Sequence, residues 1–160
     1  MRAIFTGYAP AEGRVQMLIA ARQLLPWHWP RWRGDQSVAK VEAWLKTYFN
    51  GAHAHAVDSG RAALQLLLET QRLKRGDEVL VQAYTCLVVV NAIRWAGGTP
   101  VFVDVKPDFT MDPTDAAKKI TTRTRAMIIQ HTFGIAADTM SLLKIATKHK
   151  LFSIEDCAHS

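Results

Sequence analysis

Hydrophobic residues follow a helical rhythm in the first third of the chain. Apolar positions recur every three or four residues and predict helices over residues 11–25 and 35–49. Pro26 ends the first of these helices, and a loop rich in tryptophan and broken by proline follows at residues 27–32. We therefore expect a helical segment over residues 1–52.

From residue 53 onward the rhythm changes to short, continuous apolar runs that alternate with helical stretches. The predicted strands cover residues 54–57, 78–82, 100–105, 125–130 and 151–155, and the predicted helices cover residues 60–72, 88–96, 115–120 and 141–149. Strands that are apolar on both faces and alternate with helices are typical of a mostly parallel sheet covered on both sides. The pattern predicts an α/β domain over residues 53–160.

Polar residues gather where several predicted strands end. The run Asp58-Ser59-Gly60-Arg61 lies between a strand and a helix, where free backbone N–H groups and the positive helix end suit a phosphate. Such a run is also a common helix cap, and that alternative stays open on this motif alone.

A carboxylate closes the last predicted strand. Asp156 follows Glu155, and because side chains alternate along a strand only one of the two can face a site. His131 and the segment 84–86 also follow strands, and the carboxyl ends of parallel strands share one edge of a sheet. We expect Cys86 and His131 to lie between Gly60 and Asp156 at that edge. The alternative for Asp156 is a surface acid that caps the next segment.

Composition narrows the classes of function. The chain has 160 residues, of which 49% are apolar and 21% charged, enough for one sizeable core. Its net charge of +6 is not gathered on one face, so we expect no nucleic-acid partner. The two cysteines lack metal-ligand spacing, and we expect no metal site. No apolar run reaches the ~18 residues of a membrane span, and no signal peptide is evident, so we expect a cytoplasmic protein without membrane contact.

An ordered series of motifs resembles one known family. The matching stretches are residues 58–64, 75–81, 91–105, 112–113, 124–129, 131–134, 137–138 and 154–159. In this order they are similar to the N-terminal part of the DegT/DnrJ/EryC1/StrS family of sugar aminotransferases, which depend on pyridoxal 5′-phosphate (PLP). The resemblance implies part of the large domain of fold-type I PLP enzymes.

The same resemblance implies a cofactor site. Its residues would be Ser59, Gly60, Arg61, Cys86, Asp156 and His159. The first three would hold the phosphate, Asp156 would pair with the pyridine nitrogen, and His159 would lie near the ring hydroxyl. Two residues depart from the family pattern: Arg61 replaces a threonine, and Cys86 replaces the aromatic residue that usually stacks on the ring.

The resemblance assigns no catalytic residue to this chain. In the family, the lysine that links covalently to the cofactor follows the Asp156 motif, at a position after Ser160. We therefore expect a truncated or separately encoded part that is inactive alone. For the complete enzyme the implied partners are a nucleotide-linked keto-sugar, an amino donor such as glutamate and a second copy in a homodimer. A PLP-dependent sugar dehydratase on the same scaffold and a non-catalytic fragment are the alternatives.

Overall fold

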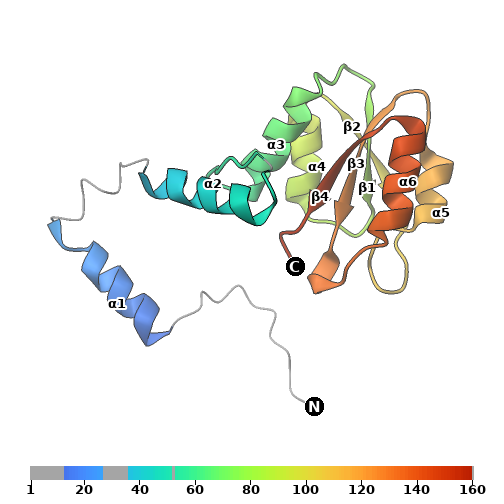
Figure 1. The fold of residues 1–160 in the computed structure, drawn as a ribbon. Coiled ribbons are helices and arrows are strands. Elements are labelled where there is room, and N and C mark those ends of the chain that lie inside the picture. The colour runs from blue at the N-terminus through green and yellow to red at the C-terminus, as the bar shows by residue number, and fades with distance from the viewer. Residues whose placement is uncertain (1–12, 27–35, 52, 160) are drawn as a thin grey trace, which may run out of the picture. The chain divides into compact units, whose positions relative to one another are not determined.

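The computed structural model describes residues 13–26, 36–51 and 53–159 (Figure 1). They fall into two compact units, one within residues 1–56 and the other within residues 57–160. No helix among the described residues is long and apolar enough to cross a membrane.

The first unit contains two helices. They are α1 (Arg14–Gln23) and α2 (Gln36–Tyr48), so both helices predicted from the apolar rhythm are confirmed. On α2 the rings of Trp44 and Tyr48, one turn apart, stack at 5.3 Å and are both exposed. The tryptophan-rich loop at residues 27–32 lies outside the described residues.

The second unit is a parallel sheet with helices on both faces (Figure 1). Its elements are α3 (Gly60–Thr70), β1 (Glu78–Gln82), α4 (Leu87–Trp95), β2 (Thr99–Val103), α5 (Pro113–Lys119), β3 (Thr124–Gln130), the 3₁₀ turn η2 (Thr132–Gly134), α6 (Thr139–His149) and β4 (Phe152–Asp156). The strand order is β2-β1-β3-β4, and each neighbouring pair is parallel. The predicted fold class is therefore confirmed.

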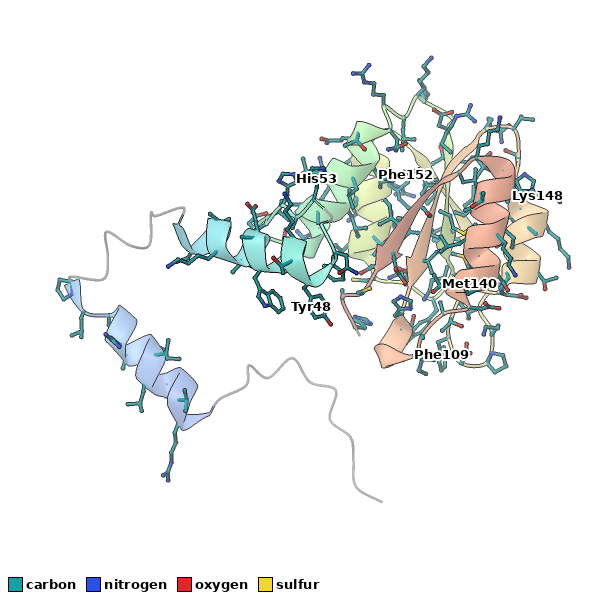
Figure 2. The ribbon with its side chains drawn as sticks, in the orientation of Figure 1. Tyr48, His53, Phe109, Met140, Lys148 and Phe152 are labelled. Carbon is teal, nitrogen blue, oxygen red and sulfur yellow. The ribbon has the colours of Figure 1, made fainter. Side chains whose placement is uncertain are left out.

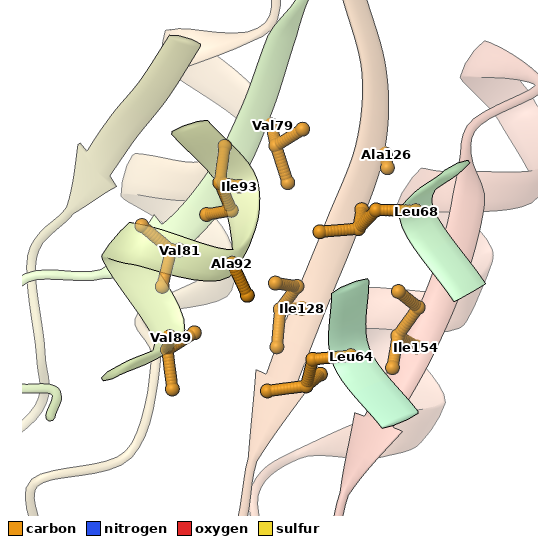
Figure 3. Close-up of a cluster of buried hydrophobic side chains, with 10 residues drawn as sticks. All are labelled: Leu64, Leu68, Val79, Val81, Val89, Ala92, Ile93, Ala126, Ile128 and Ile154. Carbon is orange, nitrogen blue, oxygen red and sulfur yellow. The ribbon is translucent and has the colours of Figure 1, made fainter. Parts of the chain in front are cut away.

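Two hydrophobic cores lie on opposite faces of this sheet. The first packs α3 and α4 on the sheet; its buried residues are Leu64, Leu68, Val79, Val81, Val89, Ala92, Ile93, Ala126, Ile128 and Ile154 (Figure 3). The second packs α5 and α6 on the other face; its buried residues are Leu80, Val103, Met111, Ala116, Met127, Ile129, Ala137, Leu142. Alternate strand residues enter alternate cores, as the pleat of a strand requires.

One predicted strand is wrong. Residues 53–58 form no strand but an irregular, mostly exposed segment that leads into α3. This stretch has only one β-branched residue, Val57, among alanines and histidines, so its propensity for a sheet is weak. The phosphate-binding motif at residues 58–61 consequently follows a loop.

Candidate cofactor site

The order in which strands are added to the sheet reverses between β1 and β3. From β1 the chain passes through α4 to β2 on one side, whereas β3 lies on the other side of β1 and leads through α6 to β4. Helices α4 and α6 cover opposite faces. Ligands of open α/β sheets bind outside the carboxyl ends of the strands at such a switch point. The topology therefore directs attention to the residues that follow β1 and β3.

The N-terminus of α3 points toward this carboxyl edge. Figure 3 shows Leu64 beside Ile128 and Ile154, while Leu68, one turn later, lies beside Ala126 near the start of β3. The helix thus runs antiparallel to the strands, and its first residue, Gly60, lies toward their carboxyl ends.

Local sequence explains how this helix begins. Ser59 is its N-cap in extended backbone conformation, and the Ser59 hydroxyl accepts from the Ala62 N–H at 3.3 Å. The first N–H groups of a helix have no acceptor within it, which leaves those of Gly60 and Arg61 available to a ligand. A side chain added at Gly60 would meet no atom within 4 Å, so the approach to the backbone there is open. Arg61 is exposed and adds a positive charge.

Asp156 lies on the same face of the sheet as α3. Ile154, two residues earlier in β4, packs into the α3–α4 core, so the Asp156 side chain points to that face. Its carboxylate accepts at Oδ1 from the Ala158 N–H (3.1 Å) and at Oδ2 from Gln130 Nε2 (3.2 Å). A carboxylate has about four lone-pair positions, so each oxygen can accept another donor. The group is half-buried.

Cys86 is placed by α4. It is the N-cap of that helix, exposed, and its backbone carbonyl accepts from the Val89 N–H at 3.0 Å. Because α3 and α4 cover the same face, Cys86, Gly60 and Asp156 all belong to the carboxyl end of that face.

The prediction that His131 lies between Gly60 and Asp156 is wrong. Its Nε2 contacts Glu155 Oε1 at 2.8 Å, and its Nδ1 accepts from the Ala137 N–H at 3.1 Å. Glu155 alternates with Asp156 along β4, so this buried histidine lies on the α6 face and does not line the space between Gly60 and Asp156.

The same contacts decide how the group formed by His131, Glu155 and Cys157 is interpreted. Ligand atoms of these three residues lie within 4.8 Å of one another. However, Nδ1 of His131 accepts a backbone N–H, which fixes the tautomer with the proton on Nε2, where it is donated to Glu155. A metal at Nε2 would displace that proton, so we interpret the group as a hydrogen-bonded support for β4.

His159 lies beside an exposed group of aromatic rings. Its ring is nearly parallel to that of Phe133, at 6.2 Å. Phe133 in turn contacts Tyr84 and Phe109, with ring centroids 6.0 and 6.1 Å apart. Figure 2 labels Phe109 at the carboxyl edge, at the opposite end of the sheet from Phe152.

Two glutamines at this edge were not predicted as functional. Gln82 ends β1 and is fully buried; its Nε2 lies near the carbonyls of Tyr84 (2.7 Å) and Phe109 (3.3 Å) and the Thr132 hydroxyl (2.7 Å). Gln130 ends β3 and contacts Asp156. The signal was present in the sequence, because each glutamine directly follows the apolar run of its strand, residues 79–81 in β1 and 126–129 in β3.

Comparison with known proteins identifies the class. Residues 14–160 match the model of the DegT/DnrJ/EryC1/StrS aminotransferase family, and the chain belongs to this family. The structure resembles that of DesV from S. venezuelae, with a TM-score of 0.71 and 38% identity over 74% of this chain and 32% of that one. NtdA from Bacillus subtilis with bound cofactor PMP gives a TM-score of 0.71 and 32% identity over 74% of this chain and 28% of that one.

Among curated proteins, the chain is 41% identical over 130 residues to the UDP-N-acetyl-3-dehydro-alpha-D-glucosamine 3-aminotransferase of Acidithiobacillus ferrooxidans. The match covers 79% of this chain and 34% of that protein. The chain spans about a third of the length of the curated relatives that it matches. The fold is that of the large domain of PLP-dependent aminotransferases.

Proposed function

We propose that this chain forms the cofactor-binding part of a PLP-dependent aminotransferase that acts on nucleotide-linked keto-sugars. The observation that carries the proposal is that the open N-terminus of α3 and the Asp156 carboxylate lie on one face, toward one edge of the sheet. Membership of the aminotransferase family supports it. The amino donor would be an amino acid such as glutamate, and the protein would work as a homodimer.

The residues present fit the cofactor. A phosphate dianion needs several donors and positive charge, and the N–H groups of Gly60 and Arg61, the positive end of α3 and the Arg61 guanidinium supply both. The hydroxyl of Ser59 can add one more contact. A protonated pyridine nitrogen needs an anionic acceptor, and Asp156 keeps lone pairs free for it.

Each group then has a defined task. Bound PLP would supply an electron sink for amino-group transfer. Asp156 would keep the proton on the ring nitrogen, which maintains that sink, and the start of α3 would fix the phosphate. Cys86 and His159 would border the ring, with His159 held against Phe133.

The test is binding of pyridoxamine 5′-phosphate (PMP), which needs no covalent link to the protein. Titration of the purified chain, followed by PMP fluorescence, should show saturable binding. Asp156→Asn should weaken it about tenfold or more, because a charge-assisted hydrogen bond is lost. Asp138→Asn is the matched control, since Asp138 caps α6, which packs on the opposite face, and asparagine keeps that cap. Equal affinity of Asp156→Asn and wild type would contradict the proposed site.

The substrate class has its own measurement. The whole protein should transfer the amino group of glutamate to a nucleotide-linked keto-sugar, followed as 2-oxoglutarate release. A dehydratase would instead remove a hydroxyl from the sugar and leave no new amino group on it, which mass spectrometry of the product distinguishes.

A further inference from the structure

We propose that Gln130 is a positioning residue that orients the Asp156 carboxylate for the cofactor ring, and that Thr85 in turn fixes Gln130. This inference rests on the proposed function. The three side chains form a continuous chain of hydrogen bonds across the switch point between β1 and β3. The Thr85 hydroxyl donates to Gln130 Oε1 at 2.5 Å, and Gln130 Nε2 donates to Asp156 Oδ2 at 3.2 Å.

Sheet register brings these groups together. Gln130 and Asp156 are paired residues of the parallel strands β3 and β4. Each lies two residues after a core residue of the α3–α4 face, Ile128 or Ile154, so both side chains point to that face. Thr85 lies three residues past the end of β1, the central neighbour of β3. The network therefore joins the ends of three strands on the face that carries the start of α3.

The network assigns each atom of the Gln130 amide. Because a threonine hydroxyl is both donor and acceptor, it does not by itself settle which amide atom faces it; an ionised Asp156 does, since it can only accept. Nε2 must therefore face Asp156 and Oε1 must face Thr85. Donation by Thr85 to Oε1 polarises the amide and strengthens its N–H donation to the carboxylate. Removing Gln130 would take away the contact at Oδ2 and leave the carboxylate held at Oδ1 by the Ala158 N–H, so its orientation would be less fixed.

A contrast with Gln82 shows why this is a positioning role. Gln82 is fully buried, and the groups near its amide are backbone carbonyls and the buried Thr132. Gln130 is half-buried, and its amide contacts a carboxylate that keeps free acceptor positions. One glutamine holds loops together, and the other holds the group that would meet the ligand.

The experiment uses PMP labelled with ¹⁵N in the ring and compares Gln130→Leu with wild type. We expect PMP affinity to fall about five- to tenfold, the effect of one hydrogen bond to a charged group. The ¹⁵N resonance of bound PMP should move toward that of the unprotonated ring. Thr85→Val should weaken binding about two- to threefold, and Thr85→Ser, which keeps the hydroxyl, should restore most of that loss.

The control and the contrary outcomes separate the two proposals. Gln65→Leu removes another amide-to-carboxylate contact, that to Glu69 within α3, and should leave both readouts unchanged. If wild type binds PMP and Asp156→Asn weakens it, but Gln130→Leu has wild-type affinity and an unmoved ¹⁵N resonance, the positioning role alone is wrong. If wild type shows no binding, the proposed cofactor site and this inference both fall. Circular dichroism confirms that each variant is folded.

Discussion

Glu78 and Asp156 are carboxylates at opposite edges of the same sheet, and their surroundings differ in a way that separates structure from function. Glu78 begins β1, is buried, and its carboxylate accepts from the hydroxyls of Thr121 (2.5 Å) and Thr124 (3.3 Å) and pairs with Arg123. Asp156 ends β4, is half-buried and accepts one hydrogen bond per oxygen.

The difference lies in what the contacts leave over. The oxygens of Glu78 accept from donors in the turn before β3 and from Thr124, the first residue of β3. The carboxylate therefore joins the start of β1 to the start of β3. Asp156 is oriented by its contacts and still able to accept another donor. A carboxylate that is held but not saturated is the better candidate for binding a ligand, and residue type alone could not show this.

The largest loss of stability should come from removing the charge of Glu78, whose two carboxylate oxygens both accept hydrogen bonds. Glu78→Gln should lower the free energy of unfolding by about 2 kcal/mol, because charge-assisted hydrogen bonds are lost in a buried position. Asp156→Asn should change it by less than about 0.5 kcal/mol. Chemical denaturation of both variants measures the contrast. Similar losses at the two sites would show that Asp156 is as structural as Glu78.

The same contrast should appear in the pH dependence of stability. The hydroxyl of Thr121, together with Arg123 and Thr124, lowers the pKa of Glu78 below its ordinary value of 4.5 despite burial. A lowered pKa in the folded state means that Glu78 contributes stability above the unfolded pKa and loses it as pH falls through the folded pKa.

As the pH is lowered from about 6 to below the ordinary glutamate pKa, the denaturation midpoint of the wild type should therefore fall more steeply than that of Glu78→Gln. The comparison with the variant is needed because other carboxylates also titrate there. Asp108, whose pKa the Thr110 hydroxyl and N–H and Lys106 lower to about 2, is one of them. Parallel curves for the two proteins would show that Glu78 does not contribute to the pH dependence of stability.

A somewhat smaller loss is expected at Gln82. Replacing Gln82 with leucine removes a donor near two carbonyls and a hydroxyl, but it also removes Oε1, a buried atom with no hydrogen-bond partner in the structure. The two effects oppose each other, so we expect a loss of about 1–2 kcal/mol. Gln65→Leu on α3 is the control and should stay within about 0.5 kcal/mol. A neutral Gln82→Leu would mean that the loops carrying Tyr84 and Phe109 are held by other contacts.

Strong local patterns made much of the fold predictable. Runs such as residues 78–82 and 125–130 are apolar enough to read as buried strands, and β1 and β3 lie there. The segment 54–57 failed because a weak strand pattern needs a pairing partner, which the sequence does not reveal.

The site was predictable in part for a similar reason. Alternation along a strand correctly separated Asp156 from Glu155. The sequence could not place His131, whose orientation depends on Ala137 and Glu155 across a turn and a neighbouring strand. Nor could it reveal the contact between Gln130 and Asp156, which depends on the register of two strands far apart in sequence.

The smallest expected change in stability concerns one residue with left-handed backbone at each edge of the sheet. Lys150, just before β4 at the amino edge, and Phe133, at the carboxyl edge, both have left-handed backbone with φ of 56°. Lys150 is exposed and ends α6, so Lys150→Gly should raise the free energy of unfolding by about 0.5–1 kcal/mol through relief of backbone strain. Phe133→Gly relieves the same strain but loses ring contacts with Tyr84 and His159, and its gain should be smaller or absent. Denaturant midpoints decide this, and an equal gain at both positions would mean that the Phe133 ring contributes nothing to the carboxyl edge.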